Sequence, residues 1–569
     1  MLYSKLKSLF FTIAILIGLW VLIIEIINPA GEFMINDDWA FVRTLQILIS
    51  EGRFAPTGWG PSWAPGGPAL LTHLIWARIF TYFWGFSLTG LRVSVLIIGI
   101  LGSVALLVLL KMSKAGVAEA FWATLTLVFN PLFLSQSFTF MTDVTFTSMT
   151  IFALLFLEFG VEHRKIYMLV IGLFFALLAI LTRQLGIVIA IAFVLLCFIH
   201  PAGRAIGKWK ASCLALGLAI IPWVAYEYYL SVVGSTPLSQ HLVLQEMFLY
   251  PQVKGFPDYF MFLFEGLFTC GLTYVGFLIS PVLALKYRLI FSWRPFRYFA
   301  VVFTGLFILF EAALIGGIID APVKFCLNVI FNFGLGPVLL KDVYIMGVQR
   351  VPALPAAWYY LAVYWAILAE AGCLQLMFRS LMRLSKAIVH QEHPDIAFLP
   401  ALSLLAGLMY LGIIVLSGFH DRYLIAVCVF FIVWLISDRD PSDQPVFTSR
   451  ALFAGAVPLV VMIWFSVSGV HDFMALKRSQ KEALDYLTQD IRVNPCNVDG
   501  GFEFNGYHCY DPNFQPKEGL SWWWVHKEDY VITLGPLPGY DTVGTFPFKR
   551  LCGPPAAIHI LKPVRQDGN

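Results

Sequence analysis

The chain has 569 residues, of which 59% are hydrophobic, 16% are aromatic and only 13% are charged. Its mean hydropathy is +0.78, whereas a typical soluble domain carries about 25% charged residues. These values exclude a soluble globular protein and a disordered chain, because the long apolar runs have no water-facing partner. A formal net charge of +3, with Lys and Arg in short separated clusters, also argues against a nucleic-acid partner. The composition therefore predicts an all-α polytopic membrane protein.

Apolar windows predict about thirteen membrane-spanning helices, since a helix needs about 20 apolar residues to cross a bilayer. The predicted spans are 9–28, 88–110, 117–135, 144–160, 166–182, 185–200, 211–230, 261–285, 299–319, 353–378, 396–417, 423–437 and 450–469. Several of these windows are short, so the count is open by about one or two. The first apolar run is too long for a cleaved signal peptide and is expected to stay as the first helix.

Basic residues in the short loops set the orientation of the chain. With the N-terminus in the cytoplasm, every predicted inner loop is basic, from Lys5 and Lys7 at the start to Arg439 and Arg450 before the last span. The prediction is a transmembrane module of residues 1–470, followed by a small mixed C-terminal domain of residues 471–569 on the extracytoplasmic side. The short loops favour a cell inner (plasma) membrane of a bacterium.

Nine cysteines are present, and three of them, Cys496, Cys509 and Cys552, lie in the polar C-terminal region. If this region faces an oxidising compartment, one disulfide is expected. Cys496 and Cys509 are the closest pair in sequence, but the pairing of the three is left open.

Carboxylates mark the first outer loop, residues 29–87. Asp37 and Asp38 precede an amphipathic stretch, Ala40 to Ser50, which is expected to lie in the membrane interface. Two adjacent carboxylates at a membrane boundary are costly unless they are solvated, paired or used. The alternative is a simple helix cap, because Asp is favourable at a helix N-terminus without any function.

A further carboxylate, Asp143, ends the second outer loop, residues 135–143, where the fourth span begins. It too is compatible with a helix cap. Two outer boundaries that both present Asp nevertheless suggest one shared site. In such a site one carboxylate can accept a proton, because a neighbouring carboxylate raises its pKa.

Two cationic segments are predicted on the same face. Arg183 is followed by Gln184 between the fifth and sixth spans, and Arg422 stands between His420 and Tyr423 before the twelfth. Arg binds phosphate through a planar fork of donors. The alternatives are snorkelling of Arg183 toward the headgroups and a local pair of Arg422 with Asp421. His73 and His241 are interpreted as ordinary surface or core histidines rather than metal ligands.

Four short motifs together resemble the GT-C membrane glycosyltransferases. More narrowly, they resemble the family of the protein O-mannosyltransferases and the lipid A aminoarabinose transferase. The motifs are Asn36-Asp37-Asp38-Trp39 with Gly52, Met141-Thr142-Asp143, Leu181-Thr182-Arg183 where the family has Lys, and Asp421-Arg422-Tyr423-Leu424. The resemblance covers about residues 9–440. The chain departs from the family at 63–68, where members often carry an acidic residue or His followed by Lys-Pro.

The resemblance implies a GT-C-type bundle that transfers a sugar from a polyprenyl-phosphate carrier to a hydroxyl on an acceptor glycan, lipid or protein, with inversion. Asp37 is the predicted base, with Asp143 and Asp38 holding or tuning the acceptor. Arg183 and Arg422 are predicted to bind the donor phosphate, with Gln184, His420 and Tyr423 as contributors. No cofactor is required, and a divalent metal is left open. The donor sugar and the acceptor are not readable, and a lipid or sugar transporter or flippase is the alternative function.

Overall fold

The structure is a computed structural model of the chain. It describes residues 2–54, 69–232, 255–315, 328–331, 334–350, 356–390, 396–417, 420–439, 449–511 and 513–564. His241 and the segment 63–68 lie outside the described residues.

Helices make up the part of the chain that precedes the C-terminal region. They are α1 (Leu2–Ile27), α2 (Asp38–Glu51), α3 (Leu71–Trp84), α4 (Leu88–Met112), α5 (Val117–Val128), α6 (Pro131–Ser137), α7 (Thr142–Glu162), α8 (Ile166–Ile180), α9 (Ile187–Ile199), α10 (Pro201–Ile206), α11 (Lys208–Ala215), α12 (Ile221–Val232), α14 (Phe256–Phe264), α15 (Thr273–Leu278), α16 (Ser280–Leu285), α17 (Tyr287–Ser292), α18 (Arg294–Ile315), α19 (Ala356–His390), α20 (Phe398–Ser417), α21 (Leu424–Ser437) and α22 (Ser449–Asp485). The predicted all-α class of the membrane part is confirmed.

Every predicted span overlaps helix, but fewer helices have the length to cross a membrane. Among the described residues, eight helices are long and apolar enough, or nine if α5 and α6, which meet at a 65° bend, form one span. The helices α8 and α9 are apolar but shorter. These lengths and compositions are those of a multi-pass membrane protein, whereas the number thirteen stays a prediction.

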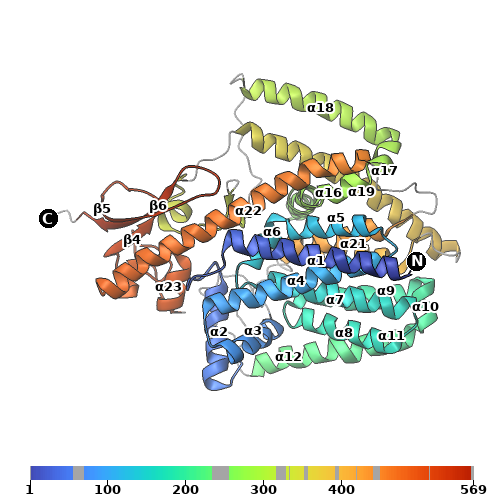
Figure 1. Cartoon of the computed structure of the whole chain (residues 1–569), viewed down its shortest axis with the longest axis horizontal. Coiled ribbons are helices and arrows are strands. Elements are labelled where there is room, and N and C mark those ends of the chain that lie inside the picture. The colour runs from blue at the N-terminus through green and yellow to red at the C-terminus, as the bar shows by residue number, and fades with distance from the viewer. Residues whose placement is uncertain are drawn as a thin grey trace.

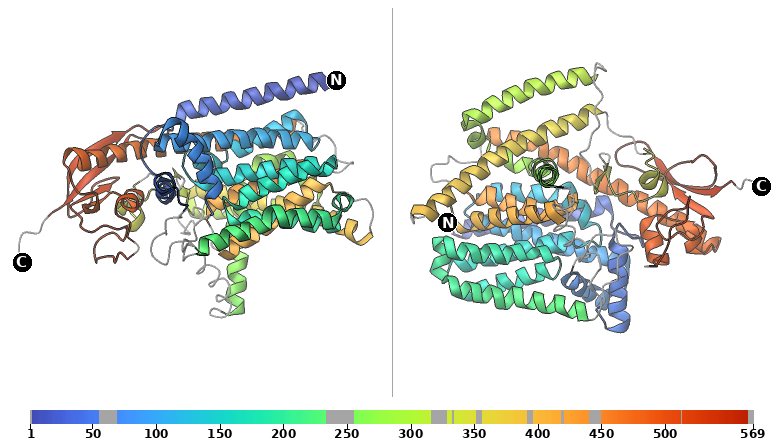
Figure 2. Two further views of the ribbon diagram at one scale, coloured as in Figure 1. Left: turned by 90° about the horizontal axis from the view of Figure 1, so that it is seen from below. Right: turned by 180° about the vertical axis from the view of Figure 1, so that it is seen from behind.

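The bundle is organised around α21. All residues of this helix are buried, as expected for a helix that is apolar on every side. Small residues let neighbouring helices approach: a Cβ added to Gly172 on α8 would lie 2.8 Å from the backbone nitrogen of Leu157 on α7. By contrast, α1 runs along one edge (Figure 2), and only 28% of its apolar window is buried within the chain.

The C-terminal region lies beyond one end of the bundle, and the N-terminus of the chain lies at the other end (Figure 1). It contains α23 (Phe502–Cys509) and a sheet of β3 (Val498–Asp499), β4 (Tyr530–Thr533), β6 (Ala556–Pro563) and β5 (Tyr540–Phe548), in that order. β3 and β4 are parallel, and the other pairs are antiparallel. A separate hairpin joins β1 (Ile330–Phe331) to β2 (Gly334–Leu335). This agrees with the predicted small mixed domain.

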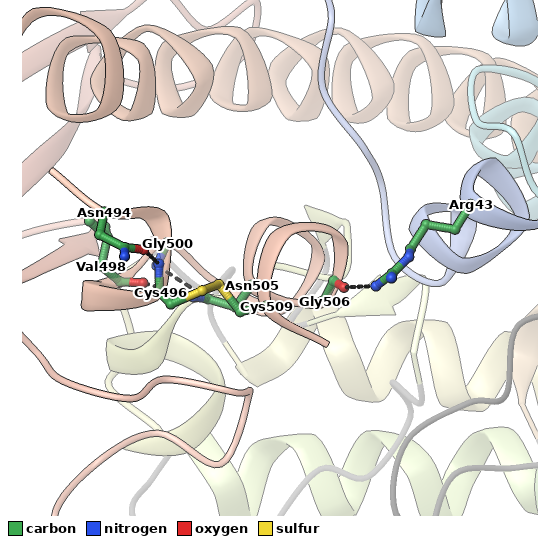
Figure 3. The surroundings of a disulfide bond; sticks show 8 residues. All are labelled: Arg43, Asn494, Cys496, Val498, Gly500, Asn505, Gly506 and Cys509. Carbon is green, nitrogen blue, oxygen red and sulfur yellow. Dashed lines mark hydrogen bonds between the residues drawn. A yellow bond between two sulfur atoms is a disulfide. The ribbon is translucent and has the colours of Figure 1, made fainter. Parts of the chain in front are cut away.

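Two features connect the C-terminal region to the bundle. The helix α22 crosses the predicted boundary at residue 470 without a break, so the boundary itself stays a prediction. The helix α23 packs on α2, which lies across the end of the bundle (Figure 1). The disulfide Cys496–Cys509 holds one end of α23, and Arg43 of α2 donates to the carbonyl oxygen of Gly506 (Figure 3). Among the three cysteines whose pairing the sequence left open, the bond therefore joins the two that are closest in sequence.

Candidate active site

Asp37 occupies the N-cap position of α2, but its side chain makes no capping hydrogen bond. Instead, its Oδ2 atom accepts a hydrogen bond from Nη2 of Arg422 at 2.8 Å. The Asp37 side chain is 17% exposed and that of Arg422 is 5% exposed. The helix-cap interpretation therefore does not account for this carboxylate, because its partner is a cation 385 residues away in sequence.

Arg422 is held in place by its neighbour. The carboxylate of Asp421 accepts hydrogen bonds from the backbone N–H groups of Val329 and Ile330, each at 2.9 Å, and from the backbone N–H of Arg422 at 2.7 Å. The local side-chain pair between Arg422 and Asp421 is therefore wrong. Asp421 fixes the backbone, and the Arg422 guanidinium is left for Asp37.

A second acid–base pair lies deeper. Nη2 of Arg183 donates to Oδ2 of Asp143 at 2.9 Å, and its Nε donates to the hydroxyl of Thr142 at 2.8 Å. The side chains of Arg183 and Asp143 are 9% and 2% exposed. Such burial is not the geometry of an arginine that snorkels to the headgroups.

Tyr423 joins the two pairs. Its ring centroid lies 4.9 Å from Cζ of Arg183 and 5.5 Å from Cζ of Arg422, which are cation–π distances. Burial lowers the pKa of the Arg422 guanidinium, but the negative charges of Asp37 and of Asp143 both act on it and raise this pKa overall. The structure therefore brings the two predicted aspartates and the two predicted arginines, from four separate segments, into one cluster.

One side of the Arg422 guanidinium is unused. Its Nε and Nη1 atoms are buried, and neither has a hydrogen-bond partner within the part of the chain that the structure describes. Buried N–H groups without a partner are costly. An arginine held in this state offers two donors to an anion that enters the cluster.

The remaining predicted contributors surround the same cluster. Nδ1 of His420 lies 3.2 Å from Nδ2 of Asn328, and its ring packs edge-on to Tyr423. Burial, reinforced by the charge of Arg422, lowers the pKa of His420 to about 4, so this histidine is neutral near pH 7. Gln184 directly follows Arg183, and its buried Nε2 also has no partner among the described residues. The cationic charge of the cluster therefore comes from the arginines.

Asp38 points into the protein rather than toward Arg422. It is 2% exposed, and its oxygens accept from the backbone N–H of Ile35 at 2.7 Å and, weakly, from that of Phe140 at 3.5 Å. Burial raises the pKa of Asp38 to about 8 despite these N–H groups and the charge of Arg92. These contacts join the two outer loops, and the predicted contact with the acceptor stays a prediction.

The histidine and acidic residues do not gather as metal ligands would. No group of three or more His, Cys, Asp or Glu side chains has metal-binding geometry in the described segments. His73 is buried, with Nδ1 2.9 Å from the Thr145 hydroxyl and Nε2 3.2 Å from the Phe140 carbonyl oxygen. It is therefore a hydrogen-bonded core residue. Whether a divalent metal takes part stays open.

Sequence reasoning missed two parts of the site's support. The anchoring of Asp421 on Val329 and Ile330 has no local signal, because the partners are 92 and 91 residues away. The second is Glu503 of α23, whose Oε1 accepts from the backbone N–H of Asn36 at 3.0 Å and from Nζ of Lys477 at 2.8 Å. The one hint in the sequence is the presence of charged residues such as Lys477 near the end of α22, which need partners where they are buried.

Comparison with known proteins agrees with the motifs. Residues 68–226 match the family described as dolichyl-phosphate-mannose-protein mannosyltransferase. The predicted resemblance to the protein mannosyltransferases is thereby confirmed. The matched segment of this mannosyltransferase-like chain contains Asp143 and Arg183 but not Asp37 or Arg422.

Two solved structures are also similar to this chain, and both are of ArnT from Cupriavidus metallidurans. The apo structure is 12% identical, covers 85% of this chain and 80% of its own, and has a TM-score of 0.36. The structure bound to undecaprenyl phosphate is 13% identical, covers 85% and 81%, and has a TM-score of 0.35. TM-scores below 0.5 establish nothing about this site, which stands on its own contacts. No curated protein sequence matches the chain.

Proposed function

We propose that this protein is a membrane glycosyltransferase that moves a sugar from a polyprenyl-phosphate carrier to an acceptor hydroxyl, in a GT-C-type bundle. The match to a family whose name contains a polyprenyl-phosphate sugar supports glycosyl transfer from such a donor. The observation that carries the proposal is the buried Arg422, which pairs with Asp37 and keeps two guanidinium nitrogens, Nε and Nη1, without hydrogen-bond partners in the described chain.

The phosphate of the donor is the leaving group, and it gains negative charge as the bond to the sugar breaks. Fixed cations in a water-poor site stabilise such charge strongly, since they need no reorganisation during the reaction. Arg422 supplies the free donors, and Arg183 adds a second positive charge across the Tyr423 ring. The apolar surfaces between the helices suit the polyprenyl tail.

The acceptor hydroxyl must lose its proton as it attacks. Each of the two aspartates pairs with an arginine, but Asp37 is 17% exposed while Asp143 is 2% exposed, so Asp37 is the one that an acceptor hydroxyl can reach. In this scheme the hydroxyl oxygen bonds to the anomeric carbon, the carbon–phosphate-oxygen bond breaks with its electrons going to the phosphate, and the proton moves to Asp37. A single displacement of this kind inverts the anomeric carbon.

The predicted orientation places this chemistry on the extracytoplasmic side of an inner membrane. The cluster lies where α2 crosses the end of the bundle next to the C-terminal region, and the N-terminus lies at the other end (Figure 1). An N-terminus and a C-terminal region at opposite ends of the bundle (Figure 1) are compatible with opposite sides of the membrane, and only the basic loops of the sequence indicate which side is the cytoplasm.

The test uses the purified full chain in lipid nanodiscs with radiolabelled single-sugar polyprenyl phosphates, polyprenyl-phosphate-mannose among them. The acceptor is an envelope extract from cells that lack the gene. We expect transfer of label to the extract with release of polyprenyl phosphate, and loss of both in Asp37→Asn. The exposed-strand variant Asp541→Asn is the matched control. Movement of label across a liposome bilayer without transfer would support a flippase instead and overturn the proposal.

A further inference from the structure

A cavity of about 320 Å³ lies between the first outer loop and the C-terminal region, and Asp37 and Arg422 are not among the residues that line it. The first outer loop, the start of α4, the last turns of α22 and the helix α23 enclose it. Its lining includes Glu32, Phe86, Lys477, Leu484, Glu503 and Tyr507. None of the two aspartate–arginine pairs lines it. The volume lies in the range of small-molecule binding sites, so this is a second space beside the proposed reaction centre.

Four of the five charged side chains that line the cavity form two ion pairs, and Glu32 leaves a formal net charge of −1. Lys477 pairs with Glu503 at 2.8 Å, and Lys481 pairs with Asp485. Glu32 accepts from the backbone N–H of Leu88 at 2.7 Å. Burial lowers the pKa of His508, which is therefore neutral near pH 7. A lining with a net charge of −1 disfavours a phosphate, whereas its paired ions and its amides present both donors and acceptors to a neutral polar ligand.

Aromatic rings complete the lining of the cavity. Phe33, Phe86, Phe504 and Tyr507 surround the same space, and such rings offer flat apolar faces with, in tyrosine, a polar tip. Two lining residues, Glu503 and Gln480, each keep one buried oxygen without a hydrogen-bond partner in the described segments. Flat rings beside unused hydrogen-bond acceptors suit a sugar, which has apolar C–H faces and hydroxyl donors at its rim.

We propose that this cavity binds a neutral, hydroxyl-rich carbohydrate that forms part of the acceptor. The role of this carbohydrate as an acceptor rests on the proposed function. Its binding in the cavity does not depend on sugar transfer. Glu503 connects the two spaces: it lines the cavity, and its Oε1 atom accepts from the backbone N–H of Asn36 at 3.0 Å, directly before Asp37. A carbohydrate bound here therefore lies against the turn that carries the proposed base.

The test measures binding of a neutral oligosaccharide, N,N′-diacetylchitobiose or mannotriose, to the full chain in nanodiscs by saturation-transfer NMR. We expect saturable binding, which Phe86→Ala weakens about tenfold through loss of one ring face. Thr488→Trp should abolish binding by filling the cavity. Phe83→Ala is the matched control, because Phe83 is also an exposed aromatic residue near the start of α4 but does not line the cavity.

Two further measurements distinguish a membrane-anchored glycan from a free one, and a failure of carbohydrate binding from a failure of sugar transfer. A glycolipid with a neutral glycan headgroup, placed in the same nanodisc, should compete with the free oligosaccharide if the natural ligand is membrane-anchored. Equal weakening by glycolipid and by glycan-free lipid would favour a free glycan. Asp37→Asn and Arg422→Ala should bind the oligosaccharide as the wild type does, even where transfer fails. No saturable binding, or equal effects of Phe86→Ala and Phe83→Ala, would overturn the proposal.

Discussion

The two aspartate–arginine pairs are chemically alike but differ in side-chain exposure and in the number of hydrogen-bond donors without partners. In the pair of Asp143 and Arg183, the side chains are 2% and 9% exposed, and Thr142 takes up a further guanidinium N–H. In the pair of Asp37 and Arg422, the carboxylate is 17% exposed, and two guanidinium nitrogens lack partners among the described residues. The first pair has the contacts of a closed structural link, and the second has those of a site that awaits a ligand.

This difference indicates separate roles for the two pairs, although both consist of an aspartate and an arginine. A buried ion pair is costly to break but is weak evidence for stability in itself. Its clearest use is to fix geometry, and here Arg183 reaches the Tyr423 ring from one side while Arg422 reaches it from the other. We therefore expect changes in the closed pair to act first on folding and placement, beyond the charge that Arg183 adds across the Tyr423 ring, and changes in the open pair to act mainly on chemistry.

The largest effect on activity is expected at Asp37, in the open pair. Asp37→Asn removes the proposed base while keeping the size of the side chain, and we expect transfer to fall by about 10²–10⁴-fold, the usual contribution of general base catalysis. The measurement is the single-turnover rate of polyprenyl phosphate release. Thermal stability should fall as well, because the buried Arg422 loses its counter-ion, so the rates are compared at a temperature at which both proteins are folded. A variant with near-normal rate would remove Asp37 from the chemistry.

The next largest effect is expected at Arg422. Arg422→Ala should slow transfer by about 10²–10³-fold, as the loss of one preorganised donor typically does. Arg422→Lys should recover only part of this, because lysine keeps the charge but lacks the planar fork. Polyprenyl phosphate binding, followed by intrinsic fluorescence, should weaken in the same order. Equal binding by all three proteins would contradict a phosphate role.

The sequence predicted the helices because length and apolarity decide whether a segment lies in a bilayer. Each predicted span overlaps helix, and the predicted helix 40–50 lies within α2 (Asp38–Glu51). The number of spans stays a prediction, since α21 is apolar but has only 14 residues and is buried by other helices of the bundle. Burial by other helices and burial by lipid leave the same apolar signal in a sequence.

The site was predicted as a set of residues but not as a set of pairs. Asp37, Asp143, Arg183 and Arg422 each stand at a predicted outer boundary of a span. The choice of partner depends on the backbone N–H groups of Val329 and Ile330, which take up Asp421 and leave Arg422 for Asp37. Nothing local in the sequence indicates that contact. The side chain of Asp38 turned inward for a similar reason, since Ile35 supplies its partner.

Substitutions in the closed pair should lower the stability of the protein more than they lower its activity. Arg183→Ala leaves Asp143 buried without its cation, and we expect a loss of about 3–5 kcal/mol in the free energy of unfolding. Arg183→Lys should lose much less, because lysine keeps the charge. The double variant Arg183→Met with Asp143→Leu should regain stability over Arg183→Ala, and thermal unfolding in nanodiscs measures all three. A loss of activity in the double variant at normal stability would show that the closed pair also takes part in transfer.

The smallest effect concerns Asp38 and pH. Burial raises its pKa from 3.8 to about 8, so the folded protein binds this proton more tightly than the unfolded chain. The resulting stability is fully present below about pH 4 and is lost as pH rises toward 8. Asp38→Asn cannot ionise, so the difference in Tm between Asp38→Asn and wild type should grow in favour of Asn from pH 6.5 to 8. It should then level off, because above the folded-state pKa the carboxylate is ionised in both the folded and the unfolded chain. The exposed control Asp541→Asn should show no such trend. A constant difference from pH 6.5 to 9 would mean that Ile35 and Arg92 keep Asp38 ionised throughout, and Asp38 would then be a third fixed charge beside the open pair.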